Sequence, residues 1–151
     1  MSKNSEDPNL WVGQVYAVGR FLPLELPQFL SAVPAGFPSP AEDHVESYLD
    51  LNHYLIQHPH ATFFTRVQGD SMTEAGIHSG DLLIVDRALE ALSGQVVIAA
   101  LDGELTVKRL IKRRGKVYLQ AANPNYPPLP IRSETDCVIW GVVTYAIHQV
   151  R

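Results

Sequence analysis

The residues best suited to chemistry lie in the segment GDSMTEAG, where Ser71 follows a glycine-led turn and Glu74 comes three positions later. Two interpretations fit this spacing. In the first, Ser71 caps the N-terminus of a helix and Glu74 completes a capping box. In the second, Ser71 is a nucleophile at a loop-to-helix junction, where converging backbone N–H groups stabilise an oxyanion. The local sequence alone favours the helix cap, because a serine nucleophile also needs a base.

A lysine in the segment LDGELTVKRLIK is a candidate for that base. None of the six histidines lies in a context typical of a catalytic triad, and no G-x-S-x-G motif is present. If residues 102–103 form a two-residue hairpin turn, Val97 faces Lys108. Alternation then puts Lys108 on the same strand face as Thr106 and Leu110, and apolar neighbours favour the neutral amine that a lysine base requires. The same strand pattern is also typical of an ordinary surface lysine.

Three other features have a structural interpretation as well as a chemical one. Cys137 is the single cysteine, so no internal disulfide is possible, and its position at the start of an apolar run favours a buried thiol over a reactive one. His58 and His60 could form a weak metal pair, but a surface turn is favoured because no cysteine or carboxylate ligand accompanies them. The basic stretch at residues 108–116 favours a solvated hairpin end over a surface for DNA or a partner.

The chain changes character twice along its length. Residues 1–40 are rich in proline and have no helical periodicity, which predicts an extended N-terminal arm whose apolar side chains lie on another surface. Residues 41–57 carry apolar residues at spacings of three and four, which predicts one or two short amphipathic helices that end at Pro59. Residues 41–151 therefore form the second predicted unit, a compact and mainly antiparallel β domain with hairpin turns at residues 102–103 and 114–115.

Composition limits the classes of function. Hydrophobic residues make up 46% of the chain, which is enough for a globular core. The net charge of −4 argues against broad nucleic-acid binding, so direct DNA binding is not expected. The N-terminal segment lacks the layout of a signal peptide, and no apolar run reaches the roughly 18 residues of a membrane span. We therefore expect a cytoplasmic protein with no membrane association.

Taken together, these motifs resemble the LexA/UmuD family of self-cleaving serine peptidases, and its UmuD-like members in particular. The resemblance runs from about Gly36 to Gln149 and is carried by the stretches GFPSPAEDHVE, DLNHYLIQHPHAT, GDSM, GIHSGDLLIVD, VVIAALDGE and TVKRL. It implies a LexA-like β domain with Ser71 as nucleophile and Lys108 as general base. It also implies an oxyanion hole formed by the backbone N–H groups of Asp70 and Ser71, with no metal or cofactor in the reaction.

The resemblance also implies a cleavage site within the chain. Members of the family cut their own chain between a small residue and glycine, which corresponds here to Ala35 and Gly36 in the segment AVPAGFPSP. Flanking prolines would hold this segment extended, so that it enters a cleft as a strand-like substrate. Gly36 would let the backbone approach Ser71 closely. The arm has no helix-turn-helix, so an operator-binding repressor is not expected.

The partners implied by the resemblance belong to DNA-damage tolerance in the SOS response. They are a second copy of the chain in a homodimer, the UmuC-like catalytic subunit of a Y-family translesion DNA polymerase, and a RecA filament on single-stranded DNA that activates cleavage. An extended arm of this length could reach its own domain or the domain of a dimer partner. Two alternatives remain, namely a Ser-Lys peptidase acting in trans on other proteins and a non-catalytic polymerase-binding β module.

Overall fold

The computed structural model describes residues 10–17, 23–29 and 45–151, and these form two compact units. One unit comprises residues 19–57, and the other combines residues 1–18 with residues 58–151. The predicted boundary at residue 40 and the candidate cleavage site at Ala35 and Gly36 lie outside the described residues.

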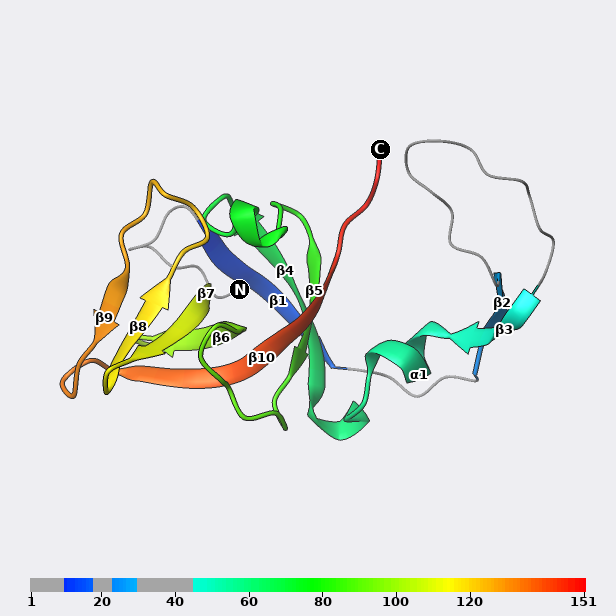
Figure 1. Cartoon of the computed structure of the whole chain (residues 1–151), viewed down its shortest axis with the longest axis horizontal. Coiled ribbons are helices and arrows are strands. Elements are labelled where there is room, and N and C mark those ends of the chain that lie inside the picture. The colour runs from blue at the N-terminus through cyan, green and yellow to red at the C-terminus, as the bar shows by residue number, and fades with distance from the viewer. Residues whose placement is uncertain (1–9, 18–22, 30–44) are drawn as a thin grey trace. The chain divides into compact units, whose positions relative to one another are not determined.

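An eight-stranded antiparallel sheet forms the larger unit, in the order β1-β4-β5-β10-β6-β7-β8-β9 (Figure 1). Its strands are β1 (Leu10–Ala17), β4 (Thr62–Gly69), β5 (Leu82–Asp86), β6 (Val96–Leu101), β7 (Glu104–Arg113), β8 (Lys116–Gln120), β9 (Leu129–Ile131) and β10 (Cys137–Ile147). The prediction of a mainly antiparallel β protein is confirmed. Within this sheet β1, from the predicted arm, is the edge strand next to β4.

The smaller unit corrects one prediction. Its strands β2 (Glu25–Phe29) and β3 (Val45–Asp50) pair antiparallel, and the α-helix α1 (Leu51–Leu55) follows directly. The helical prediction is therefore wrong for residues 45–50. Spacings of three and four suggested a helix there, but β2 supplies backbone partners that local periodicity does not reveal. The helix also ends before Pro59, which instead begins a short 3-10 helix, Pro59–Ala61.

Both predicted hairpin turns are confirmed, and they fix the register of β6, β7 and β8. Leu101 pairs with Glu104 across residues 102–103, and Arg113 pairs with Lys116 across residues 114–115. All four turn residues have positive φ, the conformation that two-residue hairpin turns of this kind require. As a result Val97 lies opposite Lys108, as the sequence predicted.

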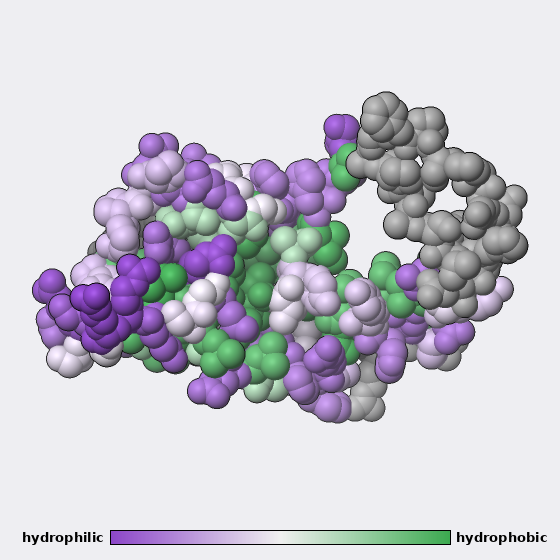
Figure 2. Space-filling model, viewed as in Figure 1, coloured by the Kyte–Doolittle hydropathy of each residue, from purple (hydrophilic) through white to green (hydrophobic). Residues whose placement is uncertain are grey.

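Two clusters of buried side chains fill the larger unit. The first contains Val67, Met72, Ile77, Leu83, Val85, Ile98 and Val107. The second contains Val97, Ala99, Leu110 and Leu119. Figure 2 shows mainly hydrophilic side chains gathered at the end of the unit where β7, β8 and β9 lie. The basic residues 112–114 and 116 are exposed there, as expected for a solvated hairpin end. No helix among the described residues is long and apolar enough to cross a membrane.

Candidate functional site

Ser71 and Lys108 come together although 37 residues separate them in the chain. Lys108 Nζ donates a hydrogen bond to Ser71 Oγ over 3.3 Å. Ser71 is fully buried and Lys108 is partly buried. A serine hydroxyl within reach of a lysine amine is the geometry required for proton transfer from a nucleophile to a base. The two side chains that the family resemblance singled out are therefore in contact.

The loop after β4 places Ser71. Gly69 ends the strand with φ of 108°, a conformation that glycine adopts without strain. The short 3-10 helix Thr73–Ala75 follows, and its N-cap position is occupied by Met72, which makes no side-chain cap. The backbone N–H of Glu74 instead donates to Ala122 O over 2.8 Å. The helix-cap interpretation of Ser71 is therefore wrong, and its hydroxyl faces Lys108 instead.

Strand β7 supplies the lysine from an apolar face. Thr106 and Leu110, two residues to either side of Lys108, are both buried, and so is the cross-strand neighbour Val97. Thr106 Oγ1 is buried without a hydrogen-bond partner among the described residues.

The carbonyl and the carboxylate of Asp70 are both held by the loop after β8. Asn123 Nδ2 donates to Asp70 O over 2.9 Å, and the Tyr126 hydroxyl donates to Asp70 Oδ1 over 2.8 Å. Both contacts fix the residue that immediately precedes Ser71. Sequence reasoning missed these two positioning residues. The segment NPNYPP is typical of a turn, but nothing local indicates what that turn contacts.

Met72 anchors the loop in the core from the other side of Ser71. Its side chain is 1% exposed and packs in the first cluster with Val67 and Ile77. Its sulfur accepts a hydrogen bond from Ala122 N over 3.4 Å, and its carbonyl accepts one from Ile77 N over 3.3 Å. Ser71 thus sits between two anchored neighbours. This limits the movement of its hydroxyl relative to Lys108.

The surroundings of Cys137, His58 and His60 do not favour a chemical role for these three residues. Burial, and then the carboxylates of Asp136 and Asp102, raise the pKa of the Cys137 thiol, which is therefore a poor nucleophile at neutral pH. His58 Nδ1 lies 2.6 Å from Asp86 Oδ2, so His58 pairs with a single carboxylate. Within the part of the chain that the structure describes, neither His58 nor His60 belongs to a group of three potential metal ligands.

Comparison with known proteins gives consistent matches over most of the chain. The family described as Peptidase S24-like matches residues 27–144. The chain is 51% identical to protein SamA of Salmonella typhimurium over 125 residues, covering 83% of this chain and 86% of SamA. It is 49% identical to protein ImpA of Escherichia coli over 126 residues, covering 83% of this chain and 85% of ImpA. It is 44% identical to the LexA repressor of Shewanella oneidensis over 102 residues, covering 68% of this chain and 49% of the repressor. The resemblance to UmuD-like proteins is confirmed.

The anchoring of Met72 leads to a prediction about stability. In a Ser71→Ala background, Met72→Ala should lower the free energy of unfolding by about 2–5 kcal/mol. The reason is that the shorter side chain leaves a cavity under the loop that follows β4. The volume-conserving Met72→Leu should cost less than about 1.5 kcal/mol. Urea unfolding followed by circular dichroism measures both. Equal stability of the two variants would contradict the packing role given to Met72.

Proposed function

Since the chain belongs to the Peptidase S24-like family, a family of serine peptidases, we propose that it cleaves itself between Ala35 and Gly36 with a Ser-Lys dyad. The observation that carries this proposal is the 3.3 Å contact between Lys108 Nζ and Ser71 Oγ. Nothing in the local sequence requires these two polar groups to meet, and a buried serine bonded to a lysine is the arrangement that the reaction needs. Similarity to UmuD-like proteins supports the assignment of this chain to the same class of protein.

The proposed reaction has two stages. Neutral Lys108 takes the proton of the Ser71 hydroxyl, and the resulting alkoxide attacks the carbonyl carbon of Ala35. The backbone N–H groups of Asp70 and Ser71 stabilise the oxyanion of the tetrahedral intermediate. Lys108 then gives its proton to the nitrogen of Gly36, the peptide bond breaks, and an acyl-enzyme on Ser71 remains. Water, deprotonated by Lys108, attacks this ester and releases a carboxylate at Ala35.

A tethered substrate explains how such a site can be specific. The candidate scissile bond between Ala35 and Gly36 lies in the same chain as Ser71, so the substrate is present at a high effective concentration. A weakly binding site can then cut its own chain without acting as a general peptidase. The proline-rich surroundings of Ala35 and Gly36 support an extended substrate segment.

The product of cleavage is proposed to carry the biological role. Residues 36–151 would form a homodimer and join a UmuC-like Y-family polymerase to permit synthesis across DNA lesions. A RecA filament on single-stranded DNA would activate cleavage during the SOS response. The support for these partners is the similarity to UmuD-like proteins.

Cleavage would also alter the larger sheet. The edge strand β1 lies before the proposed cut, whereas its neighbour β4 lies after it. Once the cut is made, β1 is no longer covalently joined to the rest of the sheet, and its departure leaves the backbone of β4 uncovered along one edge. Such an edge can pair with another strand.

The first test of the proposal uses purified full-length protein. Incubation at alkaline pH, and separately with RecA, single-stranded DNA and a nucleoside triphosphate, should yield fragments that end at Ala35 and start at Gly36, measured by intact mass. Ser71→Ala and Lys108→Ala should each slow cleavage by at least about a hundredfold. Lys108→Arg should be equally slow, because a guanidinium keeps its charge and does not act as a base.

Lys112→Ala provides the matched control for Lys108→Ala. Lys112 lies four residues further along the same strand face, but it is exposed. This variant should be cut at the wild-type rate. Cleavage of Ser71→Ala at the wild-type rate would contradict the role of Ser71 as the nucleophile. Equal slowing by Lys108→Ala and Lys112→Ala would contradict the role of Lys108 as the base.

A second prediction concerns the edge of the sheet. The backbone N–H of Val67 donates to Asp81 O over 3.1 Å on the β5 side, so by alternation the N–H groups of Phe64 and Gln68 face β1. After cleavage and separation of residues 1–35, amide exchange at Phe64 and Gln68 should become at least about tenfold faster than in uncut Ser71→Ala. Val67 should stay protected.

Nuclear magnetic resonance resolves these amides individually. Unchanged exchange at Phe64 and Gln68 would contradict the uncovering of β4. Equal acceleration at Val67 would also contradict it, because the sheet would then be loosening as a whole.

A further inference from the structure

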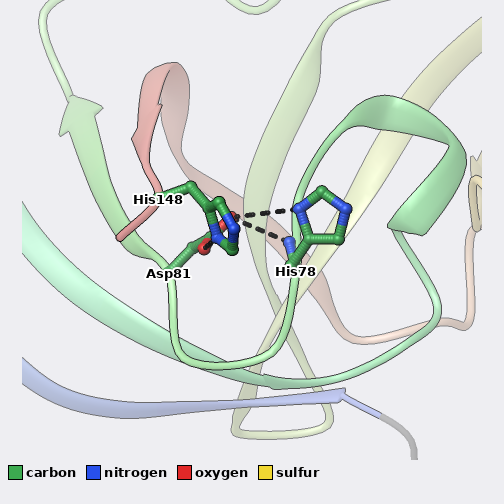
Figure 3. A group of neighbouring side chains, drawn as sticks. All are labelled: His78, Asp81 and His148. Carbon is green, nitrogen blue, oxygen red and sulfur yellow. Dashed lines mark hydrogen bonds and ion pairs between the residues drawn. The ribbon is translucent and has the colours of Figure 1, made fainter. Parts of the chain in front are cut away.

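A cluster of two histidines and one aspartate lies apart from the Ser71 and Lys108 pair. His78 and Asp81 belong to the loop before β5, and His148 follows the last residue of β10. Figure 3 shows both imidazole rings beside the carboxylate of Asp81. His148 Nδ1 is 2.7 Å from Asp81 Oδ1, and His78 Nδ1 is 3.8 Å from Asp81 Oδ2. The centroids of the two rings are 4.9 Å apart.

The cluster combines a fixed carboxylate with accessible imidazoles. The side chain of Asp81 is only 1% exposed, whereas those of His78 and His148 are 52% and 53% exposed. Asp81 Oδ2 also accepts a hydrogen bond from the backbone N–H of His78 over 2.8 Å, which holds the carboxylate in position. Hydrogen bonds of this kind orient the ligands in metal sites, and the exposed rings leave a path from solvent.

The distances suit a small transition-metal ion. Each of the three residues offers one ligand atom, and these atoms all lie within 4.8 Å of one another. Zinc in tetrahedral coordination binds nitrogen and oxygen at about 2.0–2.2 Å, which separates neighbouring ligand atoms by about 3.3 Å. His148 Nδ1 lies 2.7 Å from Asp81 Oδ1 and His78 Nδ1 lies 3.8 Å from Asp81 Oδ2, so the distances to the two carboxylate oxygens lie on either side of that value. Both histidine side chains are about half exposed, which leaves their rings room to adjust around the buried carboxylate.

We propose that His78, Asp81 and His148 bind one Zn²⁺ ion, with water as the fourth ligand. Two imidazole nitrogens favour zinc over calcium or magnesium, which prefer oxygen ligands. Binding replaces the hydrogen bond between His148 Nδ1 and Asp81 Oδ1 with two bonds to the metal. His148 then coordinates through a proton-free Nδ1 as the neutral imidazole, with its ring proton on Nε2.

The proposed ion would fasten the C-terminal segment to the loop that precedes β5. This loop is itself bonded to β4, because Gly80 N donates to Val67 O over 2.7 Å and Gly69 N donates to Ser79 Oγ over 3.2 Å. Gly69 lies two residues before Ser71. The ion would therefore stabilise the segment that leads to the nucleophile without contacting the nucleophile itself. This proposal does not depend on cleavage of the chain.

The test titrates Zn²⁺ into chelator-treated, full-length protein and measures binding by calorimetry. We expect one ion per chain and a rise in melting temperature when zinc is added. His78→Ala and His148→Ala should each weaken binding by at least about tenfold and reduce the rise in melting temperature. His60→Ala removes another exposed histidine and is the matched control, which should bind zinc like the wild type. The melting temperature of each variant in chelator provides its own baseline.

Co²⁺ gives an independent spectroscopic readout, because tetrahedral cobalt absorbs visible light more strongly than octahedral cobalt. We expect this absorption in the wild type and in His60→Ala, and its loss in His148→Ala. Failure to bind one equivalent of zinc would overturn the proposal. Equal binding by His148→Ala and His60→Ala would overturn it too, because the ion would then be held by scattered surface groups.

Discussion

The contact between Lys108 and Ser71 depends on two separate features of the fold, the register of strand β7 and the anchoring of the loop that carries Ser71. Lys108 reaches the site only because the turn at residues 102–103 sets the register of β7 against β6. A slip of one residue would move the lysine to the opposite face of the sheet. Ser71 reaches it because Met72 is packed in the core and Asp70 is held by two side chains from the loop after β8. The site therefore needs both the strand register and the anchored loop.

Local signals in the sequence predicted a large part of this arrangement. The mainly antiparallel β domain, the two hairpin turns and the pairing of Val97 with Lys108 all follow from alternation and turn chemistry. The residues alone did not assign a role to Ser71, because its spacing to Glu74 also fits a helix cap. The resemblance to a peptidase family made that choice, and the hydrogen bond with Lys108 supports it.

Features that depend on distant partners were not predictable in the same way. Residues 45–50 have spacings that suit a helix, yet they form a strand because β2 lies beside them. The hydrogen bond from Tyr126 to Asp70 joins residues 56 positions apart. His78 and His148 meet because β10 runs beside β5 in the sheet. Each of these contacts depends on which distant segments the topology brings together, and local residue patterns do not reveal this.

The central claim is that the neutral amine of Lys108 activates Ser71 for attack on the chain itself. The most direct measurement is the first-order rate constant for the appearance of the fragment that starts at Gly36, followed by mass in purified wild-type protein between about pH 7 and pH 10. If a neutral amine is the base, the rate constant rises steadily as the pH is raised. A rate constant that is constant or falls across this range would contradict the account.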